Sequence, residues 1–228
     1  DVYKRQREKR GGIKMLERIV CLAVGYVLGL FQTSYIYGRK KGIDIREHGS
    51  GNAGTTNAFR TMGKKAGALT LLGDILKCVL AMLIARLLFG NGFGDDIRLL
   101  ELYAGAGCIL GHNFPFYLKF KGGKGIAASV GLLLAFDWRI FLICAVVFFA
   151  LFFATHYVSL CSLAGYLCFV ILLVIFGQTG MYPCSQPVLY EMYVVAVLLM
   201  ALAYWRHRQN ISRLIHGNEN KIFLSKKR

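Results

Sequence analysis

The chain has 228 residues, of which 56% are hydrophobic and only 18% are charged. So few charged residues exclude a soluble domain with an ordinary surface and a disordered chain, and they predict a membrane protein. The formal net charge of +16 does not indicate nucleic-acid binding, because the basic residues lie between long apolar runs, as they do in loops that face a membrane surface. The seven cysteines have no CxxC spacing and mostly lie inside apolar runs, so we expect buried thiols rather than disulfides or a zinc site.

The beginning of the chain differs in composition from the rest. Residues 1–14 carry six Lys/Arg and two acidic residues, and Met15 then opens an apolar run. We therefore expect residues 1–14 to be a non-native or disordered extension and residues 15–228 to form a single domain. A secretory signal peptide is the alternative interpretation, but the apolar run lacks a small-x-small cleavage site followed by a soluble domain.

Long apolar runs recur along the remainder of the chain. About 20 apolar residues cross the hydrocarbon core of a bilayer. The candidate spans are 16–37, 66–89, 97–114, 122–136, 139–158, 160–177 and 187–205. Fusion of the fourth and fifth runs would leave six spans, but the fused helix would overshoot the hydrocarbon core. We therefore expect an all-α polytopic membrane protein with seven transmembrane helices.

The charges of the loops provide an orientation for these spans. The loop 38–65 and the tail from residue 206 carry seven Lys/Arg each, and the loop 115–121 carries two. The loops expected on the opposite side, 90–96, 137–138 and 178–186, carry none. The positive-inside rule then predicts that the basic loops and the C-terminus are cytoplasmic and that the N-terminus is outside.

The first basic loop contains the motif GSGNAGTTNAFRTMGKK, from Gly49 to Lys65. Its glycines let backbone amides approach a ligand closely, its hydroxyl and amide side chains donate hydrogen bonds, and Arg60 offers a planar fork for phosphate oxygens. This pattern predicts an anion-binding loop. A flexible turn between two helices is the alternative, although so many small donors exceed what a connection needs.

The second basic loop contains the motif GHNFPFYLKFKGGKGIAAS, from Gly111 to Ser129. Its glycine-rich stretch around Lys124 precedes the fourth span, where free helix amides and the positive end of the helix dipole favour a bound phosphate. The alternative is that the lysines only mark the membrane edge. The spacing of a nucleotide-binding P-loop is absent from both glycine-rich loops.

Two further segments carry polar residues on the same predicted side. Ser159 and Ser162 are three residues apart, which places both hydroxyls on one helical face, although serines near a helix end are more often caps. In the tail, His207, Asn210 and Arg213 also follow at three-residue steps, with Glu219 further on, and a tail that merely faces lipid headgroups is the alternative.

One pair of opposite charges lies inside an apolar run. Asp74 and Lys77 are three residues apart within the second candidate span, 66–89. Because lone charges are costly in hydrocarbon, we expect these two side chains to form an ion pair.

The motifs GSGNAGTTNAFR, GHNFPFYLKFKGGKG, YVSLCS and NISRLIHGNEN together closely resemble the bacterial acyl-phosphate:glycerol-3-phosphate acyltransferase family of the PlsY type. The resemblance extends from Met15 to about Ile222. It implies a seven-helix enzyme of the bacterial cell membrane with its active site on the cytoplasmic side. The implied reaction transfers a fatty acyl group from acyl phosphate to the 1-position of glycerol 3-phosphate, giving lysophosphatidic acid and inorganic phosphate.

The same resemblance assigns roles to individual residues. It implies catalytic roles for Ser50, Arg60 and Lys124. The residues with implied substrate-binding roles are Asn52, Thr56, Asn57, His112, Ser159, Ser162, His207 and Asn210. The family commonly has Arg-Tyr and Ser-Leu-Ser-Ser in the third motif, where this chain has His156 and Cys161 at the departing positions. A strict need for a cation at 156 or a hydroxyl at 161 is therefore in doubt.

The residues present fit this chemistry without a cofactor. Acyl phosphate is an activated mixed anhydride, so the enzyme mainly has to hold two anionic substrates together and stabilise developing charge. We expect direct attack by the glycerol hydroxyl, with the donor's own phosphate as proton acceptor; His112 or His207 as general base is the alternative. Because no carboxylate or Cys/His cluster has ligand spacing, we expect neither a metal nor an organic cofactor. The expected partners are the two substrates and membrane lipids, without nucleic acid.

Rival functions lack their sequence signatures. The HxxxxD motif of soluble-type glycerolipid acyltransferases and the Asp-rich metal motif of CDP-alcohol phosphotransferases are both absent. A transporter or channel for an anionic metabolite would place charged sites near the bilayer midplane and show an internal repeat. Here the polar motifs gather on one predicted side and no repeat is found.

Overall fold

The computed structural model describes residues 12–223, and every regular element in this range is helical. The apolar helices are α2 (Met15–Gly29), α4 (Thr55–Phe93), α5 (Ile97–Asn113), α6 (Ile126–Phe136), α7 (Trp138–Thr155), α8 (Val158–Gln178) and α9 (Gln186–Arg206). The shorter elements are α3 (Thr33–Arg39), α10 (Arg208–Ile215) and the 3-10 turns η1 (Ile45–Glu47), η2 (Gly94–Asp96) and η3 (Phe116–Leu118). The all-α prediction is confirmed for the described part of the chain.

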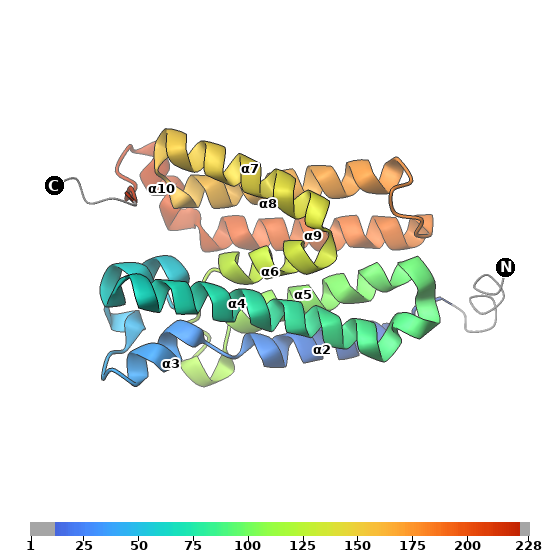
Figure 1. Ribbon diagram of the computed structural model, residues 1–228, viewed down its shortest axis with the longest axis horizontal. Helices are drawn as coiled ribbons and strands as arrows, with labels where there is room; N and C mark the ends of the chain where they lie inside the picture. The colour runs from blue at the N-terminus through green and yellow to red at the C-terminus, as the bar shows by residue number, and fades with distance from the viewer. Residues whose placement is uncertain (1–11, 224–228) are drawn as a thin grey trace.

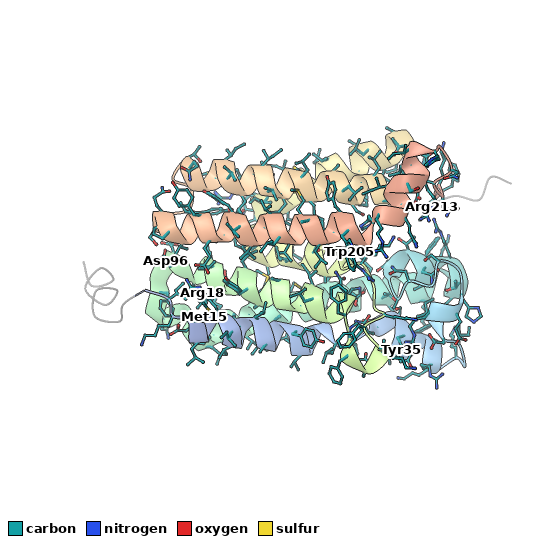
Figure 2. The ribbon with its side chains drawn as sticks, turned by 180° about the vertical axis from the view of Figure 1, so that it is seen from behind. Met15, Arg18, Tyr35, Asp96, Trp205 and Arg213 are labelled. Carbon is teal, nitrogen blue, oxygen red and sulfur yellow. The ribbon has the colours of Figure 1, made fainter. Side chains whose placement is uncertain are left out.

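The long helices lie roughly side by side in two groups (Figure 1). In the first group α2, α4 and α5 contact one another, and in the second α8 contacts both α7 and α9. The short α6 lies between the groups and contacts α4, α5 and α7. Both α3 and α10 lie at one end of the bundle, whereas α2 begins at the other end. Figure 2 shows the same polarity, with Arg213 and Tyr35 at one end and Arg18 and Asp96 at the opposite end.

Five stretches of the described chain are long and apolar enough to cross a membrane, and one of them, Thr55–Leu118, contains both α4 and α5. The expected fourth span, 122–136, is wrong in its extent, because α6 begins only at Ile126. Its 11 residues rise about 16 Å, which is about half the thickness of the hydrocarbon core. The separation of the fourth and fifth runs is confirmed: Asp137 has extended backbone angles and its carboxylate accepts a hydrogen bond from the Arg139 amide at 2.9 Å.

The expected first span, 16–37, is not one helix, because α2 ends at Gly29 and α3 begins at Thr33. The break frees carbonyl groups that would be costly if left without partners in an apolar interior. Side chains supply those partners. Lys77 Nζ donates to the Phe31 carbonyl at 2.7 Å, and the Tyr117 hydroxyl donates to the Leu30 carbonyl at 2.7 Å. Gln32 Nε2 donates to the His112 carbonyl at 3.0 Å, which ties the break to α5.

Glycines allow α2 and α5 to pack with their backbones in contact. Each helix carries a GxxxG pair, Gly25 and Gly29 on α2 and Gly107 and Gly111 on α5. A Cβ atom at any of the four would lie 2.0–2.2 Å from a backbone carbonyl oxygen of the partner helix. Small residues at this spacing are typical of membrane helix pairs, because they permit close van der Waals contact between backbones.

This packing predicts the effect of a single methyl group. Gly107→Ala should destabilise the protein by about 1–3 kcal/mol, because the new Cβ meets the carbonyl oxygen of Leu22, a backbone atom that cannot move without shifting α2. Gly90→Ala is the matched control: its Cβ meets only Arg86 Cγ, at 3.5 Å, and alanine favours a helix by up to about 1 kcal/mol over glycine. Unfolding of both variants in detergent micelles checks the difference, and equal stabilities would contradict the packing.

Candidate active site

A cavity of about 530 Å³ opens between the two helix groups. Its polar lining comes from the loop before α4, the loop before α6, the start of α8 and the segment around α10. Its apolar lining includes Leu71 on α4, Val130 on α6 and Phe148 on α7. A cavity that combines a cluster of polar groups with an apolar wall suits a ligand with a charged head and a hydrocarbon chain.

The first motif forms a loop that leads into the N-terminus of α4. Asn57 holds this loop: its Oδ1 accepts a hydrogen bond from the Ser50 amide at 2.9 Å, and its Nδ2 donates to the carbonyls of Ile45 and His48 at 3.1 and 2.9 Å. Gly49 has a φ of +59°, and a Cβ there would lie 2.3 Å from Asn57 Oδ1. Asn57 therefore stabilises the loop, in addition to the substrate-binding role that the family resemblance implies.

Apart from Asn57, the side chains of this motif that line the cavity have no hydrogen-bond partner among residues 12–223. Ser50 and Arg60 are exposed and line the cavity together with Asn52, Thr55 and Thr56. Within residues 12–223 Arg60 makes no ion pair. The first amides of α4 have no acceptor within the helix, so the helix N-terminus adds partial positive charge at the same place. The arrangement is suited to an anionic group.

The second motif folds back on the end of α5. The Gly123 amide donates to the His112 carbonyl at 3.1 Å, and a Cβ at Gly123 would lie 1.9 Å from His112 Nε2. Arg206 fixes the loop from the other side, because its Nη2 donates to the Gly123 carbonyl at 2.6 Å. Lys124 follows before α6 begins, and its Nζ donates to Asn210 Oδ1.

The tail after α9 contributes a carboxylate that connects the motifs. Glu219 Oε1 accepts hydrogen bonds from Asn210 Nδ2 at 2.7 Å and from Ser159 Oγ at 3.1 Å, and its Oε2 pairs with Arg213 Nε at 2.7 Å. Because Asn210 also accepts from Lys124, three motifs meet at this one side chain. The sequence predicts no role for Glu219, and its only distinguishing feature there is that it is the one acidic residue in a basic tail.

The two serines of the third motif have different surroundings. Ser159 bonds to Glu219, whereas Ser162 Oγ donates to the Val158 carbonyl of its own helix at 2.7 Å. His156, where the family commonly has arginine, ends α7 with a φ of +61°. Its carbonyl accepts the Ile222 amide at 3.0 Å, which fixes the tail that carries Glu219. His156 therefore holds the site together without lining it.

Burial lowers the pKa values of Lys124 and His207 at the polar end of the cavity, where the motif residues lie. The pKa of Lys124 is lowered to about 8, first by desolvation and then by the positive charge of Arg213, with Glu219 opposing the change. The pKa of His207 is lowered to about 4, mainly by burial and then by Lys124. His207 Nδ1 lies 2.8 Å from the Ala203 carbonyl, so the neutral ring donates there and leaves Nε2 as an acceptor.

All eleven residues singled out from the sequence line this cavity: Ser50, Asn52, Thr56, Asn57, Arg60, His112, Lys124, Ser159, Ser162, His207 and Asn210. Their individual roles stay predictions. Thr55 and Ser129, which belong to the first two motifs but received no predicted role, also line it, as does Tyr166, which lies outside the motifs. Asp74 was expected only as an ion-pair partner and is a lining residue as well. In the described range no group of three or more His, Cys, Asp or Glu side chains is arranged to hold a metal ion.

Known proteins resemble this chain over most of its length. A sequence profile of the family described as glycerol-3-phosphate acyltransferase matches residues 19–217. The glycerol-3-phosphate acyltransferase of Clostridioides difficile (strain 630) is 40% identical over 213 residues, which cover 92% of this chain and 98% of that protein. The one of Bacillus velezensis (strain DSM 23117 / BGSC 10A6 / LMG 26770 / FZB42) is 41% identical over 205 residues, covering 88% and 95%.

Solved structures agree with the sequence comparison. The crystal structure of PlsY in its glycerol 3-phosphate form, described as an integral membrane glycerol 3-phosphate acyltransferase, superposes with a TM-score of 0.78 at 32% identity, covering 90% of this chain and 96% of that one. The lysophosphatidic acid form superposes with a TM-score of 0.76 at the same identity. The predicted family is thus confirmed. The chain belongs to the glycerol-3-phosphate acyltransferase family of the PlsY type and is a multi-pass membrane acyltransferase of lipid biosynthesis.

Proposed function

We propose that the protein transfers a fatty acyl group from acyl phosphate to the 1-hydroxyl of glycerol 3-phosphate, with lysophosphatidic acid and inorganic phosphate as products. The observation that carries this proposal is the cavity itself, where Arg60, Lys124 and Arg213 lie beside an apolar wall. Both substrates carry phosphate, and only the donor carries a hydrocarbon chain. The related structures with glycerol 3-phosphate and lysophosphatidic acid support the same substrate and product classes here.

The proposed reaction is a direct displacement at the acyl carbon. The glycerol oxygen forms the new ester bond, the anhydride bond from the acyl carbon to the phosphate oxygen breaks, and the hydroxyl proton ends on the departing phosphate. Arg60 and Lys124 offset the repulsion between two anions and stabilise the charge that develops on the leaving group. Ser50, Asn52, Thr56, Ser159 and Asn210 orient the phosphates through hydrogen bonds.

We further propose seven membrane crossings, with the N-terminus outside and the active site and C-terminus at the cytoplasmic face of a bacterial cell membrane. The polar end of the bundle holds α3, α10 and the loop before α4, which are rich in basic residues, while α2 begins at the opposite end (Figure 1). The positive-inside rule supports this orientation. The short α6 then forms the fourth crossing from the cytoplasmic side, and after the turn at Asp137 α7 returns to the cytoplasmic side as the fifth.

Arg60→Ala should lower kcat for phosphate release by about 10²–10³-fold, because a fixed cation no longer stabilises the transferring phosphate. The assay measures inorganic phosphate and lysophosphatidic acid from purified protein in lipid, supplied with palmitoyl phosphate with and without glycerol 3-phosphate. Lys65→Ala is the matched control, since Lys65 is an exposed cation on the same helix that does not line the cavity. Equal losses in both variants, or wild-type release that ignores glycerol 3-phosphate, would contradict the proposal.

The acidity of Lys124 predicts the alkaline limb of the pH profile. Its cation is present below a pKa of about 8 and is lost as the pH rises through that value, so kcat/KM for glycerol 3-phosphate should fall above pH 8. The charges facing it come from Arg60, Arg206, Arg213 and Glu219. Lys124→Arg should move the fall to higher pH, because guanidinium stays charged. An unchanged profile in that variant would exclude Lys124 as the titrating group.

The proposed proton acceptor predicts a mild effect at His207. Since the donor phosphate takes the proton, His207→Gln should keep kcat within about tenfold of the wild type, whereas loss of a general base costs about 10²–10⁴-fold. Initial rates at saturating concentrations of both substrates measure this. A loss of that larger size with unchanged KM values would assign the proton to His207 and overturn the substrate-assisted route.

A further inference from the structure

A buried set of three ionisable side chains lies beside the second motif loop, which carries Lys124. Asp74 and Lys77 on α4 and His112 on α5 are 1%, 6% and 2% exposed. The expected ion pair between Asp74 and Lys77 is confirmed, with 2.8 Å between Oδ1 and Nζ. His112 Nδ1 lies 2.9 Å from Lys77 Nζ and 3.6 Å from Asp74 Oδ1. Asp74 and His112 both line the cavity.

The contacts of Lys77 decide which nitrogen of His112 carries the proton. An ammonium group has three donors and no acceptor. Lys77 Nζ lies among acceptors, the Asp74 carboxylate at 2.8 Å and the carbonyls of Phe31 and Gly29 at 2.7 and 3.3 Å. His112 Nδ1 is closer to Nζ, at 2.9 Å, than the Gly29 carbonyl is, and an Nδ1–H there would point at the ammonium. His112 Nδ1 therefore accepts the third hydrogen, which places the imidazole proton on Nε2. A doubly protonated ring is disfavoured, because its Nδ1–H would point at the ammonium 2.9 Å away.

The protonated edge of the ring faces the loop that carries Lys124. His112 Nε2 lies so close to Gly123 that a Cβ there would be 1.9 Å away, and no described residue accepts a hydrogen bond from it. A neutral imidazole whose Nδ1 is occupied and whose Nε2 carries a proton cannot take a proton from a substrate hydroxyl. It can only donate a hydrogen bond from Nε2.

We propose that His112 acts in the reaction as a fixed hydrogen-bond donor to a substrate oxygen through Nε2–H, and that Lys77, held by Asp74, is the positioning residue that sets its tautomer. This inference rests on the proposed acyl transfer and deepens it, because it removes His112 from the candidates for general base. The substrate oxygen is one that gains negative charge during the transfer, on the acyl carbonyl or on phosphate.

Two substitutions at His112 separate a role as hydrogen-bond donor from a purely structural role. His112→Gln keeps a donor near the position of Nε2, whereas His112→Leu removes it. We expect kcat to fall about 10²-fold in the leucine variant and to stay within about tenfold in the glutamine variant, with little change in KM for glycerol 3-phosphate. His216→Gln is the matched control, an exposed histidine away from the cavity. If glutamine were as damaging as leucine, or if leucine changed only stability, the donor role would be overturned.

The tautomer is measured without any substrate. Nitrogen NMR of protein labelled with ¹⁵N-histidine in lipid nanodiscs, assigned with the His112→Gln variant, should show a protonated Nε2 and an unprotonated Nδ1 for His112. Lys77→Met should abolish this preference and lower kcat, and the double variant Asp74→Asn/Lys77→Met serves if the single one does not fold. A protonated Nδ1 in the wild type would overturn the proposal even in an active enzyme. Inactivity of the wild type with palmitoyl phosphate would instead contradict acyl phosphate as the acyl donor, and the result on the His112 tautomer would still hold.

Discussion

The interior of an apolar bundle cannot leave backbone polar groups without partners, and this constraint governs the structure where α2 stops at Gly29. The carbonyls of Leu30 and Phe31 are bonded by Tyr117 and Lys77. The buried ammonium in turn needs a counter-charge, which Asp74 supplies from one turn away. The break after α2 therefore gives the charges on α4 a structural role. The contacts of Lys77 with Phe31 and with His112 hold α4 against the end of α5.

Glycines, which have no side chain, are as important for this arrangement as the charged residues. The GxxxG pairs of α2 and α5 let the two backbones touch, which brings the helix break next to His112. Gly123 lets the second loop lie directly on the His112 ring. The cavity and the loop that carries Lys124 are thus positioned by contacts that one methyl group would remove.

The polar end of the cavity holds its cations around a single carboxylate. Glu219 pairs with Arg213 and is bonded to Asn210 and Ser159, and Asn210 also accepts from Lys124. One carboxylate among these cations orients them without neutralising all of their charge. Partial burial then lowers the pKa of Lys124 to about 8, so its charge depends on the solution pH and on any anion that enters.

The helical class and the approximate positions of the apolar helices were predictable from the sequence, and the family resemblance pointed to eleven residues that line the cavity. Hydrophobic run length marks a membrane helix locally, and glycine-rich loops between basic residues mark an anion site by composition alone. Tertiary structure alone decided that the first run breaks at residues 30–32, that α6 has only 11 residues and that Glu219 connects three motifs. It also decided the tautomer of His112. These features depend on contacts between residues far apart in the chain, such as Lys77 with Phe31 and Ser159 with Glu219, and no local pattern encodes which distant partner will satisfy a buried polar group.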